Sequence, residues 1–292
     1  MKEDKMKVCG IQMGPFPKNR QNNWYKINKL VEKIMTSYSP NLIAFSELMS
    51  SPYIGGNINS NNFNEYAETM EGDTVSQCVD LSLTYDTHVV GTLFEKEYVG
   101  HGVNYYNSAF ICSPTKGVIG KYRKVHLPKV NSSDLVTDEK YYFEKFGKGG
   151  DEFPIFTLDN NYKVGILICF DRSFPEAWRC LSIQGVDLII VPTATFGFRK
   201  DLFIEELKIR AMENNIHVLA VNKSGEERDR DGVRNHFGNS CIIDPFGKII
   251  KEIKNQPWGY LIGDVDIRIN KTSKNKIDWL KERKPHIYAK YT

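Results

Sequence analysis

The chain has 292 residues, of which 41% are hydrophobic, and a formal net charge of +3. This composition suits one large globular unit, and the positive charges are scattered, whereas a DNA-binding protein usually gathers them on one face. No apolar run reaches the roughly 18 residues of a membrane helix, and the charged start, MKEDKMKVCG, lacks the apolar region of a signal peptide. We therefore expect a cytoplasmic protein that binds neither nucleic acid nor membrane.

Short apolar runs recur along the chain and predict β-strands. Several of them are nearly continuous instead of alternating, which is typical of strands covered on both faces. The predicted strands lie at 7–13, 41–47, 87–95, 105–113, 163–170, 186–193, 217–224, 239–245 and 260–267. A further strand is expected at GVIGKY, residues 117–122.

Helical spacing of apolar residues separates many of these runs. It predicts helices at 22–38, 75–85, 175–185 and 201–215, with Gly185 where a glycine commonly ends a helix. The alternation predicts an α/β fold, although the stretch 96–124 pairs strands without a helix and so predicts an antiparallel part. We expect long loops at 55–64 and 129–140, and such loops are often functional. Because no linker or repeat interrupts the chain, residues 1–292 are expected to form a single domain.

The six cysteines show neither a disulfide nor a metal-binding pattern. None forms a CxxC pair, and the spacing of the histidines matches no zinc motif. Several cysteines lie inside apolar runs, as buried free thiols do, which fits a reducing compartment. We expect no metal and no cofactor.

Reactive side chains follow several of the predicted strands. Glu47 comes after NLIAFS, Lys124 after GVIGKYR and Cys169 after KVGILI, while Thr193 and Thr195 follow VDLIIVP and are expected to contact the substrate. In α/β sheets such positions gather at the carboxyl edge, where ligands bind. Each residue alone also has a simple structural interpretation, the cysteine as a core thiol and the others as solvated side chains. Their combination is what indicates a site.

The three residue types complement one another chemically. A thiol attacks only as the thiolate, so it needs a base or a positive neighbour. Glu47 can take the proton and later activate water, and Lys124 can lower the pKa of the thiol and stabilise an oxyanion. The sequence therefore predicts acyl transfer from a C–N bond, with Cys169 as the nucleophile.

At these residues the chain resembles the nitrilase superfamily of carbon–nitrogen hydrolases. The matching motifs are NLIAFSELMSSPY, GKYRKVHLP and GILICFDRSFPEAWR, in this order. The resemblance implies a four-layer α-β-β-α sandwich and a homodimer or higher homo-oligomer, with a C-terminal tail, about 270–292, that packs at the dimer interface. It also implies a catalytic triad of Glu47, Lys124 and Cys169 that acts on a small-molecule substrate.

The resemblance assigns further residues to the site. A second glutamate precedes a glycine-rich turn in the family, and DEKYYFEKFGKGGDEFP offers Glu139 for this role, with Glu144 as the rival. The backbone N–H of Phe170 would be the second oxyanion donor. His126 resembles a substrate contact or a residue behind the site, and the alternative is a structural hydrogen bond.

The residues after Cys169 narrow the expected reaction. The triplet CFD replaces the Cys-Trp-Glu of true nitrilases, and CFDRSFPEAWR is similar to N-carbamoyl amino acid hydrolases. The D-amino acid enzymes of that group carry two adjacent arginines for the substrate carboxylate, whereas this chain has Arg172 followed by Ser173. One arginine can still bind a carboxylate through paired hydrogen bonds. Alternatively, Arg172 pairs with Asp171 or Glu176.

The stretch VPTATFGF, residues 191–198, looks closer to β-ureidopropionases and N-carbamoylputrescine amidases. We predict an amidohydrolase that converts an N-carbamoyl amino acid, such as N-carbamoyl-β-alanine, into the amine, carbon dioxide and ammonia. The first alternative is another amidase of the superfamily: an N-carbamoylputrescine amidase, an ω-amidase or an aliphatic amidase. The second is a catalytically inactive binding protein on the same fold.

Overall fold

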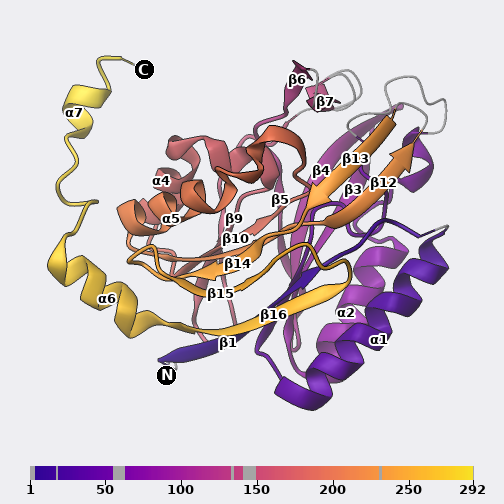
Figure 1. Cartoon of the computed structure of the whole chain (residues 1–292), viewed down its shortest axis with the longest axis horizontal. Coiled ribbons are helices and arrows are strands. Elements are labelled where there is room, and N and C mark those ends of the chain that lie inside the picture. The colour runs from indigo at the N-terminus through magenta and orange to yellow at the C-terminus, as the bar shows by residue number, and fades with distance from the viewer. Residues whose placement is uncertain are drawn as a thin grey trace.

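The computed structural model describes residues 4–17, 19–54, 63–132, 135–140, 149–229 and 232–291. Two six-stranded sheets form its centre (Figure 1). The first sheet has the order β16 (Gly259–Asp266), β1 (Lys5–Gln12), β2 (Leu42–Phe45), β3 (His88–Val99), β4 (Gly102–Ser113) and β5 (Gly117–Arg123). The second has the order β15 (Ile249–Ile253), β14 (Ser240–Ile243), β11 (His217–Val221), β10 (Leu188–Pro192), β9 (Lys163–Ile166) and β8 (Ile155–Thr157).

Each sheet has a parallel centre and antiparallel edges. Strands β1, β2 and β3 run parallel, as do β9, β10 and β11, and the remaining pairings are antiparallel. Every residue of β2, β10 and β11 is buried, because both faces of these strands are covered. The antiparallel part predicted over 96–124 is confirmed by the succession β3, β4 and β5.

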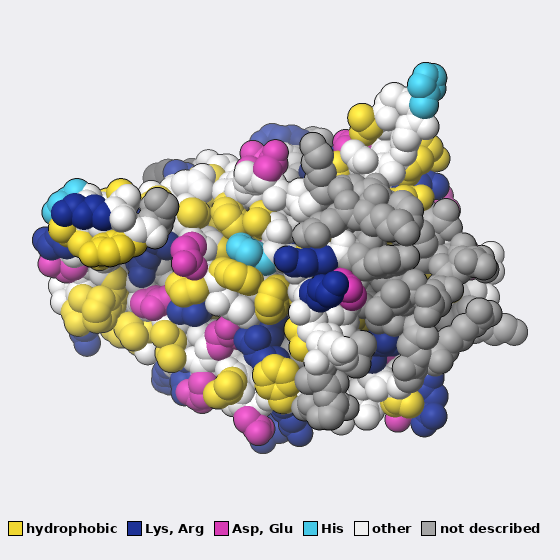
Figure 2. Space-filling view, turned by 90° about the horizontal axis from the view of Figure 1, so that it is seen from above, with side chains coloured by type: hydrophobic (Ala, Val, Ile, Leu, Met, Phe, Trp, Pro, Cys, Tyr) yellow, Lys and Arg dark blue, Asp and Glu magenta, His cyan; other side chains and the backbone are white. Residues whose placement is uncertain are grey.

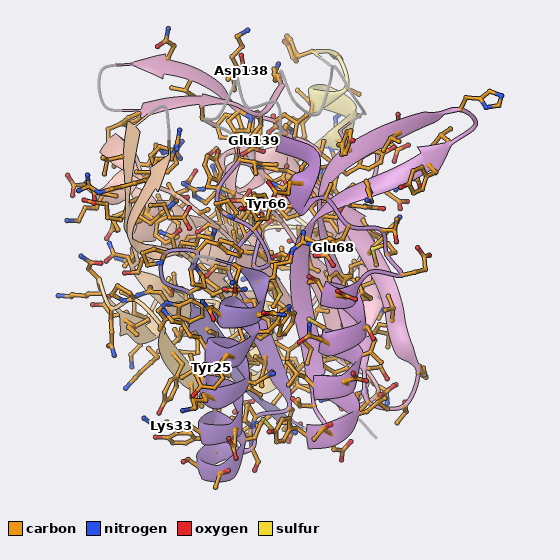
Figure 3. The ribbon with its side chains drawn as sticks, turned by 90° about the vertical axis from the view of Figure 1, so that its right-hand side faces the viewer. Tyr25, Lys33, Tyr66, Glu68, Asp138 and Glu139 are labelled. Atoms are coloured by element: carbon orange, nitrogen blue, oxygen red, sulfur yellow. The ribbon has the colours of Figure 1, made fainter. Side chains whose placement is uncertain are left out.

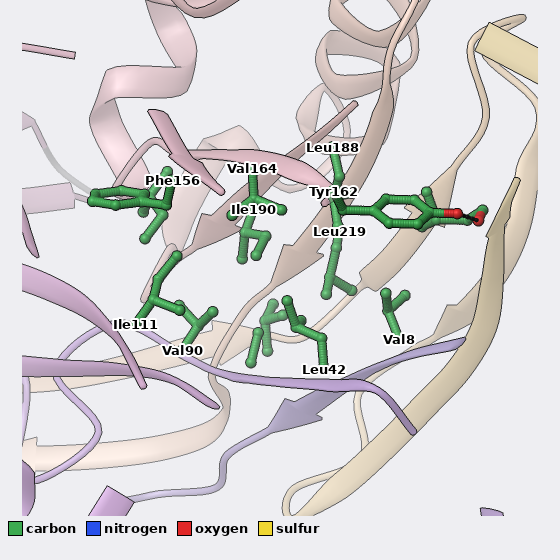
Figure 4. Packing of buried hydrophobic residues seen from close by; sticks show 14 of the residues in the cluster. Val8, Leu42, Val90, Ile111, Phe156, Tyr162, Val164, Leu188, Ile190 and Leu219 are labelled. Atoms are coloured by element: carbon green, nitrogen blue, oxygen red, sulfur yellow. Dashed lines mark hydrogen bonds between the residues drawn. The ribbon is translucent and has the colours of Figure 1, made fainter. Parts of the chain in front are cut away.

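The facing sides of the two sheets form the central core (Figure 4). Val8, Leu42, Val90 and Ile111 belong to the first sheet, and Val164, Leu188, Ile190 and Leu219 to the second. All of these side chains are at most 1% exposed. The alternate residues of the same strands point outward, so each sheet has a second apolar face that needs a cover.

Two helices cover the outer face of each sheet. Helices α1 (Arg20–Tyr38) and α2 (Asp73–Tyr85) pack on the first sheet, and α4 (Pro175–Ile183) and α5 (Phe203–Asn214) on the second (Figure 1). Helix α1 begins where the Asn19 side chain accepts a hydrogen bond from the Asn22 N–H. After α4, Gly185 has a φ of +84°, which favours glycine. The predicted four-layer α-β-β-α sandwich is confirmed.

Several segments differ from the sequence predictions. The stretch 129–140, expected as a loop, forms a hairpin of β6 (Lys129–Ser132) and β7 (Leu135–Asp138). A second hairpin joins β12 (Ser224–Asp229) and β13 (Gly232–Phe237). Both were missed because their strands are polar and lack the apolar run by which the other strands were predicted. Of the loop expected at 55–64, residues 55–62 lie outside the described part, and Phe63–Tyr66 form a 3-10 helix, η1.

The C-terminal segment leaves the two sheets. Helix α6 (Ile267–Lys276) follows β16, and the short helix α7 (Pro285–Tyr288) lies further along a strand-free stretch. In Figure 1 this end of the chain projects away from the sandwich. Packing of the tail at a dimer interface stays a prediction.

The surface carries charges of both signs. Figure 2 shows basic, acidic and hydrophobic side chains interspersed over the described part of one face. Among the helices of the described ranges, none combines the length and the apolar character needed to cross a bilayer.

Candidate active site

Four of the predicted site residues meet at one end of the two sheets. Glu47 comes two residues after β2 and Lys124 directly after β5, and these strands run in the same direction. Cys169 follows β9 of the second sheet, and Glu139 follows the last residue of β7, below the hairpin in Figure 3. Because these strands end at one edge, residues far apart in the sequence become neighbours.

Lys124 lies between the two glutamates. Its Nζ is 2.9 Å from Glu47 Oε1, and 2.9 and 2.7 Å from Glu139 Oε1 and Oε2. The three side chains are at most 1% exposed, so water screens their charges little. A buried charge is tolerated when it is paired. Here one ammonium offsets two carboxylates, which leaves an excess negative charge beside the thiol.

Two side chains that the sequence analysis missed hold these glutamates in place. Asn107 Nδ2 donates to Glu47 Oε1 at 2.8 Å and lies 3.5 Å from Glu139 Oε2. The Tyr53 hydroxyl donates to Glu139 Oε1 at 2.8 Å. The available signals were an asparagine inside an apolar strand and the tyrosine of the SSPY sequence. The rival second glutamate, Glu144, lies outside the described residues.

Burial and the Lys124 charge shift the pKa values of the two glutamates in opposite directions. Burial is the largest influence on Glu47, but Lys124 and the Asn107 hydrogen bond outweigh it and hold the pKa of Glu47 below its ordinary value. Burial and the neighbouring Glu47 raise the pKa of Glu139 against the pull of Lys124. Burial lowers the pKa of Lys124, but both carboxylates outweigh it and raise that pKa. Glu47 is therefore the better ionised of the two.

Cys169 begins the short 3-10 helix η2 (Cys169–Ser173), so the strand predicted over 163–170 ends three residues before the thiol. The φ of Cys169 is 50°, a left-handed conformation that persists only when the surroundings hold it. Its Sγ lies 3.5 Å from Thr195 Oγ1, and the residue is 8% exposed. Burial, helped by the charge of Glu47, raises the pKa of the thiol to about 11. The thiol therefore keeps its proton at neutral pH and needs a base.

The turn at Cys169 is held by Asp171, which is fully buried. Its Oδ2 accepts hydrogen bonds from the Tyr122 hydroxyl at 2.6 Å and from the Ile168 N–H at 2.9 Å. Its Oδ1 accepts one from the His126 N–H at 2.8 Å and lies 2.9 Å from His126 Nδ1. These bonds tie η2 to the end of β5. From the sequence, Asp171 was considered only as a possible partner of Arg172.

His126 and Phe170 lie next to this turn. The His126 ring stacks on Phe174 with 3.6 Å between ring centroids, and its side chain is 26% exposed. The structural hydrogen bond named as the alternative for His126 is present, whereas a substrate contact stays a prediction. The backbone N–H of Phe170 lies one residue past the thiol, in the first turn of η2. Its role as an oxyanion donor also stays a prediction.

Arg172 points into the protein and is 2% exposed. Its Nη1 donates to the Cys169 carbonyl oxygen at 2.7 Å, and its Nε lies 3.2 Å from Glu206 Oε2. The carboxylate beside it is thus Glu206 rather than Asp171 or Glu176. The guanidinium supports the backbone of the cysteine from behind.

Asn222 holds the segment that carries the two threonines. Its Oδ1 accepts hydrogen bonds from Thr193 Oγ1 and from the Thr195 N–H, both at 2.8 Å. The Thr193 carbonyl accepts from the Glu47 N–H at 3.4 Å, which links the two sheets. Thr193 is fully buried, whereas Thr195 is 7% exposed and lies at the thiol. Substrate contact by either threonine stays a prediction.

A pocket of about 70 Å³ opens beside Cys169. Aromatic, small and basic side chains line it, among them Tyr53, Phe170, Arg172, Thr195, Phe196, Phe198 and Arg199. Within the described ranges, no cluster of His, Cys, Asp or Glu side chains is arranged to hold a metal ion.

The chain matches known proteins over nearly its whole length. The family model described as Carbon-nitrogen hydrolase matches residues 7–272. A Schizosaccharomyces pombe protein named Probable nitrilase C965.09 is 32% identical, with 98% of each chain covered. Omega-amidase NIT2 of Mus musculus is 25% identical over 85% of each chain. Beta-ureidopropionase of Arabidopsis thaliana is 26% identical over 77% of this chain and 56% of its own.

Solved structures share the fold. A carbon-nitrogen hydrolase from Helicobacter pylori G27 aligns with a TM-score of 0.87 at 22% identity, covering 98% of this chain and 97% of that one. This likeness shows that the two proteins share the fold. The chain therefore belongs to the carbon–nitrogen hydrolase family of the nitrilase superfamily.

Proposed function

We propose that the protein hydrolyses a small linear ureide through an intermediate bound to Cys169, and that its substrate is an N-carbamoyl amino acid. The observation that carries the proposal is the buried Lys124, held between Glu47 and Glu139 beside the thiol. A thiol, a base that can deprotonate it and a cation that can stabilise the oxyanion are the groups that attack on a carbonyl carbon requires.

In the proposed first half of the reaction, Glu47 removes the proton of Cys169 while sulfur attacks the carbonyl carbon. The pKa of about 11 at the thiol makes this general base necessary at neutral pH. The developing oxyanion is stabilised by Lys124 and by the Phe170 N–H. Glu47 then returns the proton to the amine nitrogen, the C–N bond breaks, and a carbamoyl group remains on sulfur.

In the second half, Glu47 takes a proton from water, and the hydroxide attacks the carbamoyl carbon. The C–S bond breaks, the thiol regains its proton, and the released carbamic acid decomposes to carbon dioxide and ammonia. Glu139 positions Lys124 and the water, and Tyr53 and Asn107 in turn position the glutamates.

The proposal is tested by assaying purified protein for ammonia and carbon dioxide from N-carbamoyl amino acids. Cys169→Ala is expected to abolish both products and to leave the fold intact by circular dichroism. Cys180→Ser is the matched control, because Cys180 is an exposed free thiol away from the site, and it should keep full activity. Turnover that survives in Cys169→Ala would contradict the proposal.

An amidase acting on simple amides is the second candidate, favoured by the relative named Omega-amidase. The same residues would carry that reaction, since only the group attached to the carbonyl differs. The product ratio separates the two: a ureide releases carbon dioxide with ammonia, and a simple amide releases ammonia alone. Ammonia from amides, with no turnover of any ureide, would establish this second candidate.

We further propose that two copies associate through the α4 and α5 layer. Large apolar side chains are exposed there, namely Ile183, Leu202 and Ile209, between 52% and 60%. An exposed apolar patch on an ordered helix layer is typical of a protein interface. Light scattering should give a dimer, and Ile209→Glu should shift it to a monomer. A wild-type monomer would contradict the proposal.

A further inference from the structure

Two arginine side chains line the pocket beside Cys169. Of the described residues that line it, Arg172 and Arg199 are the charged ones. Both meet a single carboxylate, since Glu206 Oε2 is 3.2 Å from Arg172 Nε and 2.9 Å from Arg199 Nη2. Glu206 is not among the residues that line this pocket and instead lines a neighbouring one, together with Arg199. Two cations therefore share one anion.

The two arginines differ in what they can still bind. Arg172 is 2% exposed, and its Nη1 is committed to the Cys169 carbonyl oxygen. Moving it toward a ligand would remove the support of the turn at the thiol. Arg172 is thus a positioning residue.

Arg199 lines the pocket and has donor nitrogens that its two hydrogen bonds do not use. It lies in the 3-10 helix η3 (Gly197–Lys200), which follows the segment of Thr195, and its side chain is 21% exposed. Its two contacts, to Ser173 Oγ and Glu206 Oε2 at 2.9 Å each, both use Nη2. Within the described ranges, Nε and Nη1 of Arg199 make no hydrogen bond. They are held in a fixed direction by the anchored Nη2.

We infer that Arg199 binds the carboxylate of the substrate and makes the enzyme select acids over neutral analogues. The inference rests on the proposed hydrolysis at Cys169. A guanidinium matches a carboxylate through paired hydrogen bonds. The aromatic side chains of Phe196 and Phe198 also line the pocket, and they reduce the screening of this pair by water. The substrate carboxylate then supplies a second anion for the two arginines, which share Glu206.

The experiment compares matched substrates that differ in one charge: N-carbamoyl-β-alanine against its methyl ester. In Arg199→Gln, the ratio of kcat/KM for acid over ester should fall about 10- to 100-fold, the effect of losing a charge-assisted hydrogen bond. Arg199→Lys should restore part of it. Arg268→Gln, which removes a distant and exposed arginine, should leave the ratio as in the wild type. An unchanged ratio in Arg199→Gln would overturn the inference.

Two further measurements test the role of Arg199 independently of whether the protein hydrolyses ureides. If no ureide is hydrolysed, succinamate against butanamide gives the same comparison for amides, and an Arg199-dependent preference there would retain the inference. Binding of the acid substrates to Cys169→Ala, measured by calorimetry, needs no turnover. Affinity for the acid should fall about 10-fold or more when Arg199→Gln is added. Equal affinity, or no binding of any acid, would overturn the role of Arg199.

Discussion

Replacing Asp171 with asparagine keeps the shape of the side chain but turns one acceptor oxygen into a donor. Asp171 is fully buried, and each oxygen accepts from a backbone N–H, of Ile168 on one side and of His126 on the other. In either orientation of the asparagine, its NH2 group faces one of these two backbone N–H groups. Two donors then face each other, and that hydrogen bond is lost. A lost hydrogen bond to a charged group is worth about 1.5–3 kcal/mol, and an unpaired buried donor costs about 1–3 kcal/mol. We expect the free energy of unfolding to fall by about 3–5 kcal/mol.

The same substitution loosens the turn that keeps Cys169 at a φ of 50°. We therefore expect kcat to fall at least about tenfold, because the thiol loses its fixed position relative to the base. Urea denaturation and steady-state ammonia release measure the two effects. Tyr122→Phe is the matched control: it removes one of the bonds to Asp171, keeps the carboxylate, and should cost about 1–2 kcal/mol. Wild-type kcat and wild-type stability in Asp171→Asn would refute the reasoning.

Three further predictions concern charge, reactivity and packing. The pKa of Glu139 is raised on folding, so its ionisation destabilises the folded protein as the pH rises above the ordinary value of 4.5. Glutamine cannot ionise, and the stability of Glu139→Gln relative to wild type should therefore increase from mildly acidic to neutral pH, as measured by thermal unfolding. With a thiol pKa of about 11, alkylation of Cys169 by iodoacetamide should keep accelerating above neutral pH, and a plateau near neutrality in peptide mass spectrometry would contradict this. In Gly91→Ala the new Cβ would lie 2.4 Å from Phe110 Cζ, so about 1–3 kcal/mol should be lost in urea unfolding. In Gly102→Ala the nearest atom is 3.6 Å away, and the change should stay within about 0.5 kcal/mol.

Some features of the molecule were readable from neighbouring residues alone. The parallel strands β2, β10 and β11 were predicted because burial on both faces leaves a continuous apolar run. The four covering helices were predicted because burial on one face leaves apolar residues at helical spacing. Glu47, Lys124 and Cys169 were selected from short motifs after predicted strands, whereas Glu139 was assigned by the family resemblance. The polar hairpin over 129–140 left no such pattern, so its strands were not predicted.

The sequence by itself thus determined the α/β succession of strands and helices and the reactive residue types, and the four-layer arrangement was implied by the family resemblance. The tertiary structure decided which carboxylate meets Arg172, since Glu206 comes from a helix whose distance from η2 no local pattern reveals. It also decided that the hydroxyl of Ser173, the residue at which the resembling D-amino acid enzymes carry a second arginine, meets the guanidinium of Arg199. Partners of this kind depend on how α5, η2 and η3 pack against one another in space. Hydrogen bonds and ion pairs act over a few ångströms in space, and separation along the chain does not encode that distance.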